Sequence, residues 1–153
     1  MKQFTLRLQV KAQRPVIKLV DFYGFDALLD TGALFPVWVE DESILKELDA
    51  VLLMENVEFG GFGGKATGNL YRIPMLKVGE LLFPNFHMIS CKLNLPCKMI
   101  LSATMFDDLI YEVDNHNHRF NVSIPDTQST VRNLVIEDQN GNLHVLCSSG
   151  KVS

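Results

Sequence analysis

The stretch FDALLDTGALF, Phe25–Phe35, places an acidic residue and two turn-forming residues between two apolar arms. Asp30-Thr31-Gly32 on its own predicts a tight turn, in which Asp accepts local backbone hydrogen bonds and Gly takes a positive φ. The apolar arms favour a second interpretation, because a carboxylate among apolar residues is costly to bury unless something compensates its charge. Sites that bear such a cost are often functional. The stretch therefore predicts a strand, a turn and a strand, with Asp30 as a candidate catalytic residue.

The composition is that of one globular domain with a real core. The chain has 153 residues, of which 47% are hydrophobic and 21% charged. The formal net charge is -4 and no basic stripe is present, so we expect no nucleic-acid partner. The N-terminus alternates polar and apolar residues instead of forming the apolar run of a signal peptide, and no stretch approaches the length of a membrane span. These features predict a cytoplasmic protein without a membrane partner.

Strands dominate the predicted secondary structure. Alternating apolar residues over 4–10 predict a strand, and two apolar runs around Tyr23-Gly24 predict a hairpin that ends at Asp30. The strand pattern returns over 57–76, around several glycines. Similar signals predict hairpins at 76–90, 111–124 and 133–147, the last with Asn-Gly as its turn. Many strands with short turns favour a mostly antiparallel barrel or sandwich.

Two segments have the pattern of helices. Residues 41–54 place Ile44, Leu45, Leu48, Val51 and Leu52 on one helical face, and Asp41 or Ser43 can cap the N-terminus. A second, short helix is expected over 102–109, after an apolar strand.

Three elements of the sequence, in order, give a family resemblance. The segment QRPVIKLVDFYGFDALLDTGA, Gln13–Ala33, resembles the N-terminal part of retroviral-type aspartic proteases, the retropepsins. FGGFGG, Phe59–Gly64, is similar to the tip of the family's flap, and Lys98–Phe120 is similar to its second apolar strand, short helix and closing hairpin. The resemblance spans roughly 4–124. It implies a mostly β fold, a closed antiparallel β-barrel of the retropepsin (acid protease) type with one or two short helices.

The resemblance also implies an activity, aspartic-type endopeptidase, and the residues that carry it. Asp30 would be catalytic, and a peptide substrate would lie extended beneath the flap. No cofactor and no metal are implied. The supporting catalytic loop would be Thr31, Gly32 and Ala33, and the substrate-binding flap Gly60, Gly61, Phe62, Gly63 and Gly64.

The chain contains a single Asp-Thr-Gly, which has a consequence for the oligomeric state. Aspartic proteases need two carboxylates that share one proton. The segment at 125–129, PDTQS, lacks the glycine of the motif and does not supply a second copy. An active enzyme therefore has to be a homodimer, with Asp30 of each protomer at a two-fold axis.

Two departures from the family pattern, together with the tail beyond the resemblance, motivate an alternative function. Ser102 stands where the family usually has Gly, and Leu34 where it is often polar. The alternative is a catalytically inactive retropepsin-like binding or dimerisation module. We expect residues 1–124 to form the protease-like domain, and 125–153 a C-terminal extension, a β-hairpin packed on the same domain.

A third hypothesis is an unrelated small β-barrel enzyme or metal-binding protein that uses the histidines. His116 and His118 alternate, but the turn formers around them favour a solvated turn. The three cysteines are interpreted as reduced packing residues, since their number is odd and no secretion signal is present. GFGGKA, 61–66, fits a loose dinucleotide pattern, but no helix follows it to bind phosphate.

Overall fold

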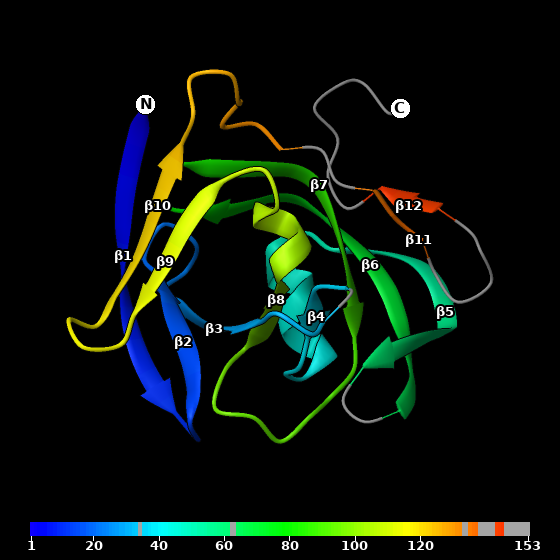
Figure 1. Cartoon of the computed structure of the whole chain (residues 1–153). Helices are drawn as coiled ribbons and strands as arrows, with labels where there is room; N and C mark the ends of the chain where they lie inside the picture. The colour runs from blue at the N-terminus through cyan, green and yellow to red at the C-terminus, as the bar shows by residue number, and fades with distance from the viewer. Residues whose placement is uncertain (34, 62–63, 133–134, 138–142, 146–153) are drawn as a thin grey trace.

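The computed structural model describes residues 1–33, 35–61, 64–132, 135–137 and 143–145, and its main feature is a ten-stranded sheet. The strands of this sheet are β1 (Lys2–Lys11), β2 (Arg14–Leu19), β3 (Phe25–Asp30), β4 (Val37–Trp38), β5 (Val51–Gly61), β6 (Gly64–Val78), β7 (Leu81–Ser90), β8 (Met99–Ser102), β9 (Ile110–Asp114) and β10 (Arg119–Ile124). Their spatial order is β5-β6-β7-β4-β8-β3-β2-β1-β10-β9 (Figure 1). Two 3₁₀ helices, η1 (Glu42–Leu48) and η2 (Ala103–Phe106), and a second sheet of β11 (Val135–Glu137) and β12 (Leu143–Val145) complete the described elements.

The predicted hairpins are present. β2 and β3 pair antiparallel, with Val16 opposite Leu28, and their connection contains Tyr23 and Gly24 at φ values of 57° and 65°. Antiparallel pairing likewise joins β6 to β7, β9 to β10 and β11 to β12. Period-two alternation therefore identified these local pairs correctly, and the Asn-Gly turn predicted between β11 and β12 lies outside the described residues.

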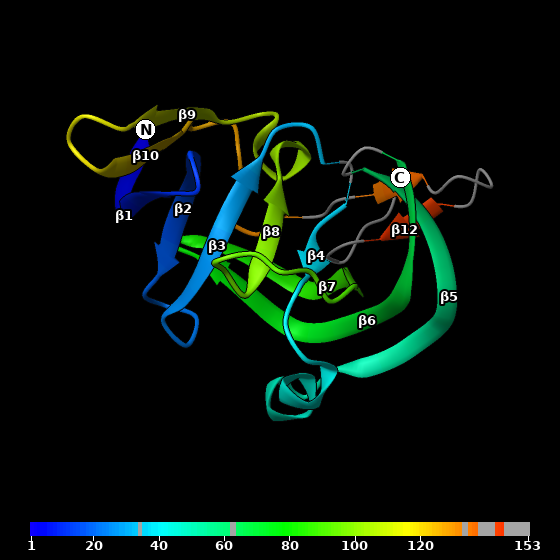
Figure 2. The ribbon, with the colours of Figure 1, turned by 90° about the horizontal axis from the view of Figure 1, so that it is seen from below.

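Two parallel pairings depart from the expected antiparallel pattern. β3 runs parallel to β8, with Leu28 opposite Ile100 and Asp30 opposite Ser102, and the two strands point the same way in Figure 2. β4 is parallel to β7 and antiparallel to β8. The first pairing brings the segment after residue 98 beside the end of β3.

The expected closed barrel is not what the strand order shows. The ten-stranded sheet has two edges, β5 and β9, and each pairs with one neighbour, β6 and β10 respectively. Over the described residues the sheet curves (Figure 2) but does not close. The broader expectation of a mostly β fold with few, short helices is confirmed.

The helix predicted over 41–54 is correct only in its first half. Asp41 caps η1, since its side chain accepts a hydrogen bond from the Ser43 amide at 2.8 Å. The helix ends at Asp49, which adopts the left-handed conformation with φ 57°, and β5 then begins at Val51. The apolar residues at 51–54 are all exposed, so they do not form a buried helical face. The second helix, η2, is also shorter than the predicted 102–109.

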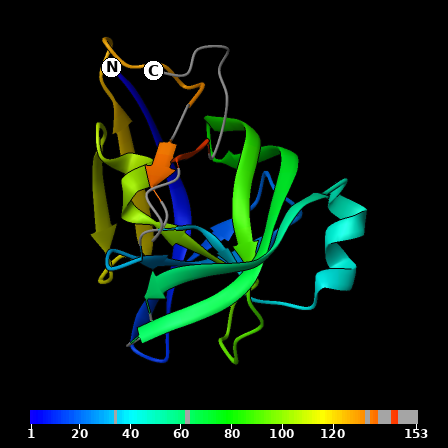
Figure 3. The same ribbon diagram turned by 90° about the vertical axis from the view of Figure 1, so that its right-hand side faces the viewer.

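Figure 3 shows η1, the cyan helix, lying outside the sheet next to the start of β5. None of the helices within the described residues is long and apolar enough to cross a membrane.

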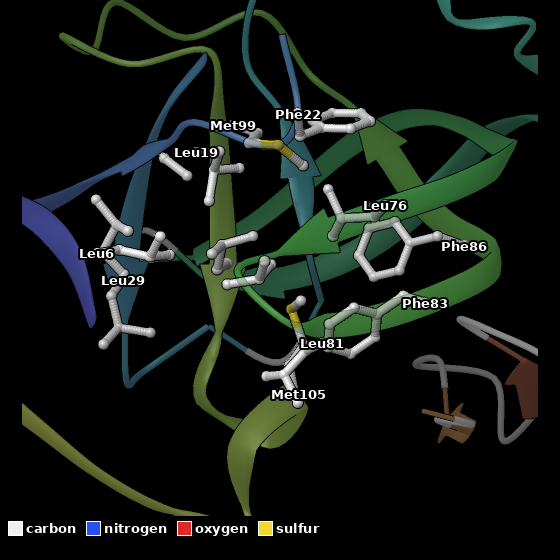
Figure 4. Close-up of a cluster of buried hydrophobic side chains, with 14 of the residues drawn as sticks. Leu6, Leu19, Phe22, Leu29, Leu76, Leu81, Phe83, Phe86, Met99 and Met105 are labelled. Atoms are coloured by element: carbon white, nitrogen blue, oxygen red, sulfur yellow. The ribbon is translucent and has the colours of Figure 1, made fainter. Parts of the chain in front are cut away.

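The core has two layers, and β3 contributes to both. Ala27 and Leu29 belong to a large cluster that includes Met105 and Phe83 (Figure 4). Leu28 points the other way, into a second cluster with residues of β4, β5 and β6. This alternation is the two-residue period of a strand buried on both faces. The end of β3 is therefore held between two apolar layers.

The segment after β10 lies along β7. The Leu82 amide donates to the Thr130 carbonyl, and the Arg132 amide donates to the Leu82 carbonyl, both at 2.8 Å. The buried Arg132 guanidinium also forms an ion pair with Asp108, which closely follows η2. These contacts attach 130–132 both to the sheet and to the turn after η2.

Gly68 on β6 provides a first stability prediction. A Cβ at this position would lie 2.4 Å from the Ser90 carbonyl oxygen and 2.6 Å from Ile89 Cγ2. Gly68→Ala is expected to lower the free energy of unfolding by about 1–3 kcal/mol, because the neighbouring strand would have to move. Urea unfolding followed by circular dichroism measures the change.

The matched control is Lys77→Ala on the same strand, where the side chain is exposed and we expect a change within about 0.5 kcal/mol. Ala is intrinsically preferred to Gly in a strand. A Gly68→Ala protein as stable as the parent would therefore contradict the close approach of β6 and β7.

Candidate active site

Asp30 lies at the end of β3 and begins a tight turn. Its Oδ1 accepts a hydrogen bond from the Gly32 amide at 2.9 Å, and its carbonyl accepts one from the Ala33 amide at 3.1 Å. The side chain is half-buried. Oδ2 forms no hydrogen bond with any residue that the structure describes. The predicted turn is confirmed, and it leaves one carboxylate oxygen available.

The other residues of the predicted catalytic loop differ in exposure. Thr31 and Gly32 are exposed, whereas Ala33 is buried in the second apolar cluster. The Thr31 side chain makes no hydrogen bond within the described part of its own chain. Leu34 lies outside the described residues. The loop is thus anchored at Ala33 and presents Thr31 and Gly32 outward.

Ser102 occupies the position directly across from Asp30 on β8. It is fully buried, and its hydroxyl is 2.8 Å from the Thr104 hydroxyl. Its backbone has φ -87° and ψ 147°, an extended conformation that any residue can adopt. The chain therefore does not require glycine here, and serine is accommodated through its contact with Thr104.

A cavity of about 410 Å³ opens beside the carboxylate. Its walls come from three strands, of which β2 and β3 form one hairpin and β9 lies much later in the chain. The lining residues are Arg14 and Pro15 from β2, Leu28, Leu29 and Asp30 from β3 with Thr31 and Gly32 after it, and Tyr111 and Val113 from β9.

Sequence analysis did not assign a role to Arg14, Tyr111 or Val113. Arg14 lies within the segment that carries the family resemblance, but nothing in its local pattern distinguishes it from a solvated arginine. Tyr111 and Val113 reach the site only because β9 pairs with β10, which in turn pairs with β1. A single sequence offers no signal for such non-local placement.

The predicted flap lies on the hairpin formed by β5 and β6. Gly60 is opposite Lys65, and Gly61 is opposite Gly64. Phe62 and Gly63, at the predicted apex, lie outside the described residues. The hairpin itself is confirmed, and its role as a substrate-binding flap stays a prediction.

The cysteines fit the packing role that the sequence predicts. Cys97 is buried and Cys91 half-buried, and both are free thiols. Burial raises the pKa of each of these two thiols, which lowers the reactive thiolate fraction at neutral pH. Cys147 lies outside the described residues.

The histidines at 116 and 118 lie in the turn between β9 and β10. Asp114 accepts hydrogen bonds there from the Asn117 amide and side chain, at 3.0 and 2.9 Å. These bonds hold the pKa of Asp114 below its usual value. Both histidines are exposed, as predicted for a solvated turn. Within the described residues, no three His, Cys, Asp or Glu side chains gather as metal ligands would.

Comparison with known proteins gives a likeness at the level of the fold. No protein-family model matches the chain, and no curated protein matches it in sequence. Among solved structures, a retropepsin-like aspartic protease from Rickettsia conorii is similar, with a TM-score of 0.52 and 12% sequence identity. The match covers 79% of this chain and 89% of that one. The chain therefore has a mostly β fold similar to that of a retropepsin-like aspartic protease.

Proposed function

We propose that the protein is an aspartic endopeptidase that is active as a homodimer. The observation that carries this proposal is the position of Asp30. Its carboxylate is half-buried at the end of a central strand, beside a cavity, in a fold similar to that of a retropepsin-like aspartic protease. General acid–base chemistry on a bound peptide requires a carboxylate that can exchange a proton there. Asp30 offers one, since its Oδ2 has no hydrogen-bond partner among the described residues.

The mechanism needs a second carboxylate, which a second protomer would supply. Two nearby carboxylates share one proton, because like charges at short distance disfavour double ionisation. The ionised Asp30 takes a proton from water, and the water oxygen attacks the peptide carbonyl carbon. The protonated Asp30 of the other protomer donates its proton to the carbonyl oxygen. Proton transfer to the amine then releases the two fragments.

The neighbouring residues have complementary roles in this proposal. The exposed Thr31 hydroxyl, which has no partner within its described chain, would bond across the two-fold axis. Gly32 would present backbone to the substrate. The glycine-rich tip between Gly60 and Gly64 would cover an extended peptide, which backbone hydrogen bonds and side-chain pockets would hold.

The alternative of an inactive binding or dimerisation module is the weaker candidate. Ser102, Leu34 and the C-terminal extension motivate it. The extended backbone of Ser102 gives no reason to expect inactivity, and Leu34 lies outside the described residues. A statine-type mimic of the tetrahedral intermediate separates the two functions, because an enzyme binds such mimics far more tightly than substrate.

A subunit-mixing experiment tests the shared active site. Purified wild-type and Asp30→Asn proteins are mixed in equal amounts. They are allowed to exchange protomers, and the mixture is then assayed for peptide cleavage. Because only wild-type homodimers would hold two carboxylates, the mixture should retain about one quarter of the activity of the same total amount of wild-type dimer. The control mixes wild type with Asp21→Asn, an exposed residue of the β2–β3 connection, and should lose nothing. Retention of one half would show that each protomer works alone.

A further inference from the structure

We propose that the cavity beside Asp30 is a subsite for a substrate carboxylate, bound by the Arg14 guanidinium. This inference rests on the proposed protease function and adds a substrate class to it: peptides with an acidic residue, or a free C-terminal carboxylate, next to the scissile bond. The cavity is large enough, since about 410 Å³ falls within the usual range of ligand pockets, about 300–1,000 Å³.

The first argument is that the charge of Arg14 is available. Its side chain is exposed and lines the cavity, and it forms no ion pair or side-chain hydrogen bond within the described residues. Neighbouring cations are used differently: Lys11 and Lys18 both pair with Asp26, at 3.0 and 3.6 Å. A guanidinium also offers two parallel N–H donors, which match the two oxygens of a carboxylate.

The second argument is the shape and chemistry of the rest of the wall. Pro15, Leu28 and Val113 provide apolar surface against which the carbon stem of an acidic side chain can pack. Tyr111 adds a hydroxyl that has no hydrogen-bond partner among the described residues.

The ring of Tyr111 is held in place by its neighbours. Its centroid lies 5.7 Å from that of Phe106 and 5.9 Å from that of Phe120, and both phenylalanines are fully buried. The tyrosine is therefore a fixed part of the wall, which lowers the entropic cost of binding a ligand there.

The third argument is electrostatic. Among the described residues that line the cavity, Asp30 and Arg14 are the charged ones. A dyad that shares one proton keeps one negative charge, so it would repel an anionic substrate group. Arg14 offsets this repulsion at the same cavity. Without it, the site would favour neutral or basic side chains.

The test compares peptides that differ at one position. A set with blocked termini carries Glu, Gln or Lys at each position flanking the cleaved bond, and kcat/KM is measured for each. For the wild type we expect Glu to be preferred to Gln by roughly 10-fold or more at one position, as hydrogen bonds to charged groups allow. Arg14→Glu should reverse the preference towards Lys, and Arg14→Lys should keep part of it. Tyr111→Phe should reduce it without reversing it.

Arg7→Glu is the matched control, since Arg7 is exposed on β1 and does not line the cavity. It should leave the Glu preference unchanged. A second peptide set, with neutral side chains and a free C-terminus, distinguishes the two sources of the carboxylate. Arg14-dependent cleavage near the chain end in this set would assign the subsite to the terminal carboxylate.

The two proposals fail in different ways. One result would overturn the subsite and leave the protease function intact. In that result the Glu and Gln peptides are cleaved with equal kcat/KM by both wild type and Arg14→Glu, and neither protein prefers a free C-terminus. If no peptide is cleaved, calorimetric titration with the Glu and Gln peptides measures whether the protein binds one of them selectively. Glu-selective binding that Arg14→Glu abolishes would support the subsite and overturn the protease function, and no selective binding would overturn both.

Discussion

Asp30→Asn is expected to lower kcat/KM for peptide cleavage by at least about 10²-fold, while the protein stays folded and dimeric. General acid–base catalysis contributes about 10²–10⁴-fold to a rate, and an amide can neither take nor give the proton that the dyad shares. The fold should tolerate the change, because the side-chain amide oxygen can still accept the Gly32 hydrogen bond seen at 2.9 Å. The substitution therefore separates chemistry from structure.

Steady-state cleavage, circular dichroism and sedimentation velocity together provide the measurement. Asp21→Asn serves as the control because Asp21 belongs to the same β2–β3 hairpin but is exposed in its connection, and its activity should match the wild type. Undiminished cleavage by Asp30→Asn would end the protease hypothesis as stated.

Phe106→Ala should have the largest effect on stability. Phe106 is fully buried at the end of η2, with ring centroids 5.7 Å from Tyr111 and 5.6 Å from Phe120. Truncation of a buried Phe to Ala costs about 3–5 kcal/mol, because it removes apolar contacts and leaves a cavity. The expected loss is a large part of the total stability of a small domain, about 5–15 kcal/mol.

Urea unfolding of the purified protein measures this loss. Phe106→Leu is the control, since it keeps most of the buried volume and should cost less than about half as much as Phe106→Ala. If the free energy of unfolding of Phe106→Ala lies within about 1 kcal/mol of the wild-type value, the aromatic cluster around η2 is not the packed unit that we describe.

The local parts of this fold were predictable because their signals are local. Alternation and turn residues identify the hairpins, as in the case of Tyr23-Gly24 between β2 and β3. The segment 51–54 shows where this reasoning fails. Four consecutive apolar residues fit a helical face as well as a strand, and the left-handed Asp49 that separates η1 from β5 has no signature strong enough to decide.

The non-local parts were not predictable from one sequence. The parallel register of Asp30 with Ser102 depends on strands that pass between two apolar layers, and each of these strands reads locally as an ordinary apolar run. The two open edges of the sheet have the same origin. Closure depends on how the first and last strands in space meet, and no local pattern encodes that.

The candidate site shows the same division. Asp30 stood out because its motif is short and contiguous and its neighbours are apolar. Arg14 and Tyr111 reach the cavity from β2 and β9, and only the sheet order brings them together. Ser102 is a further example, because the identity of the residue does not reveal its extended backbone with a φ of -87°.

The parallel partner of β3 has a consequence for biosynthesis. β3 and its neighbour β2 leave the ribosome early, whereas β8, which covers the other edge of β3, follows only after the whole β5–β7 region. Until Ser102 has been synthesised and paired, the strand that ends in Asp30 is an open edge with unsatisfied backbone groups. Such long-range parallel pairing is slow. The turn that begins at Asp30 therefore gains its second flanking strand only after residues 99–102 have left the ribosome, long after the motif itself was made.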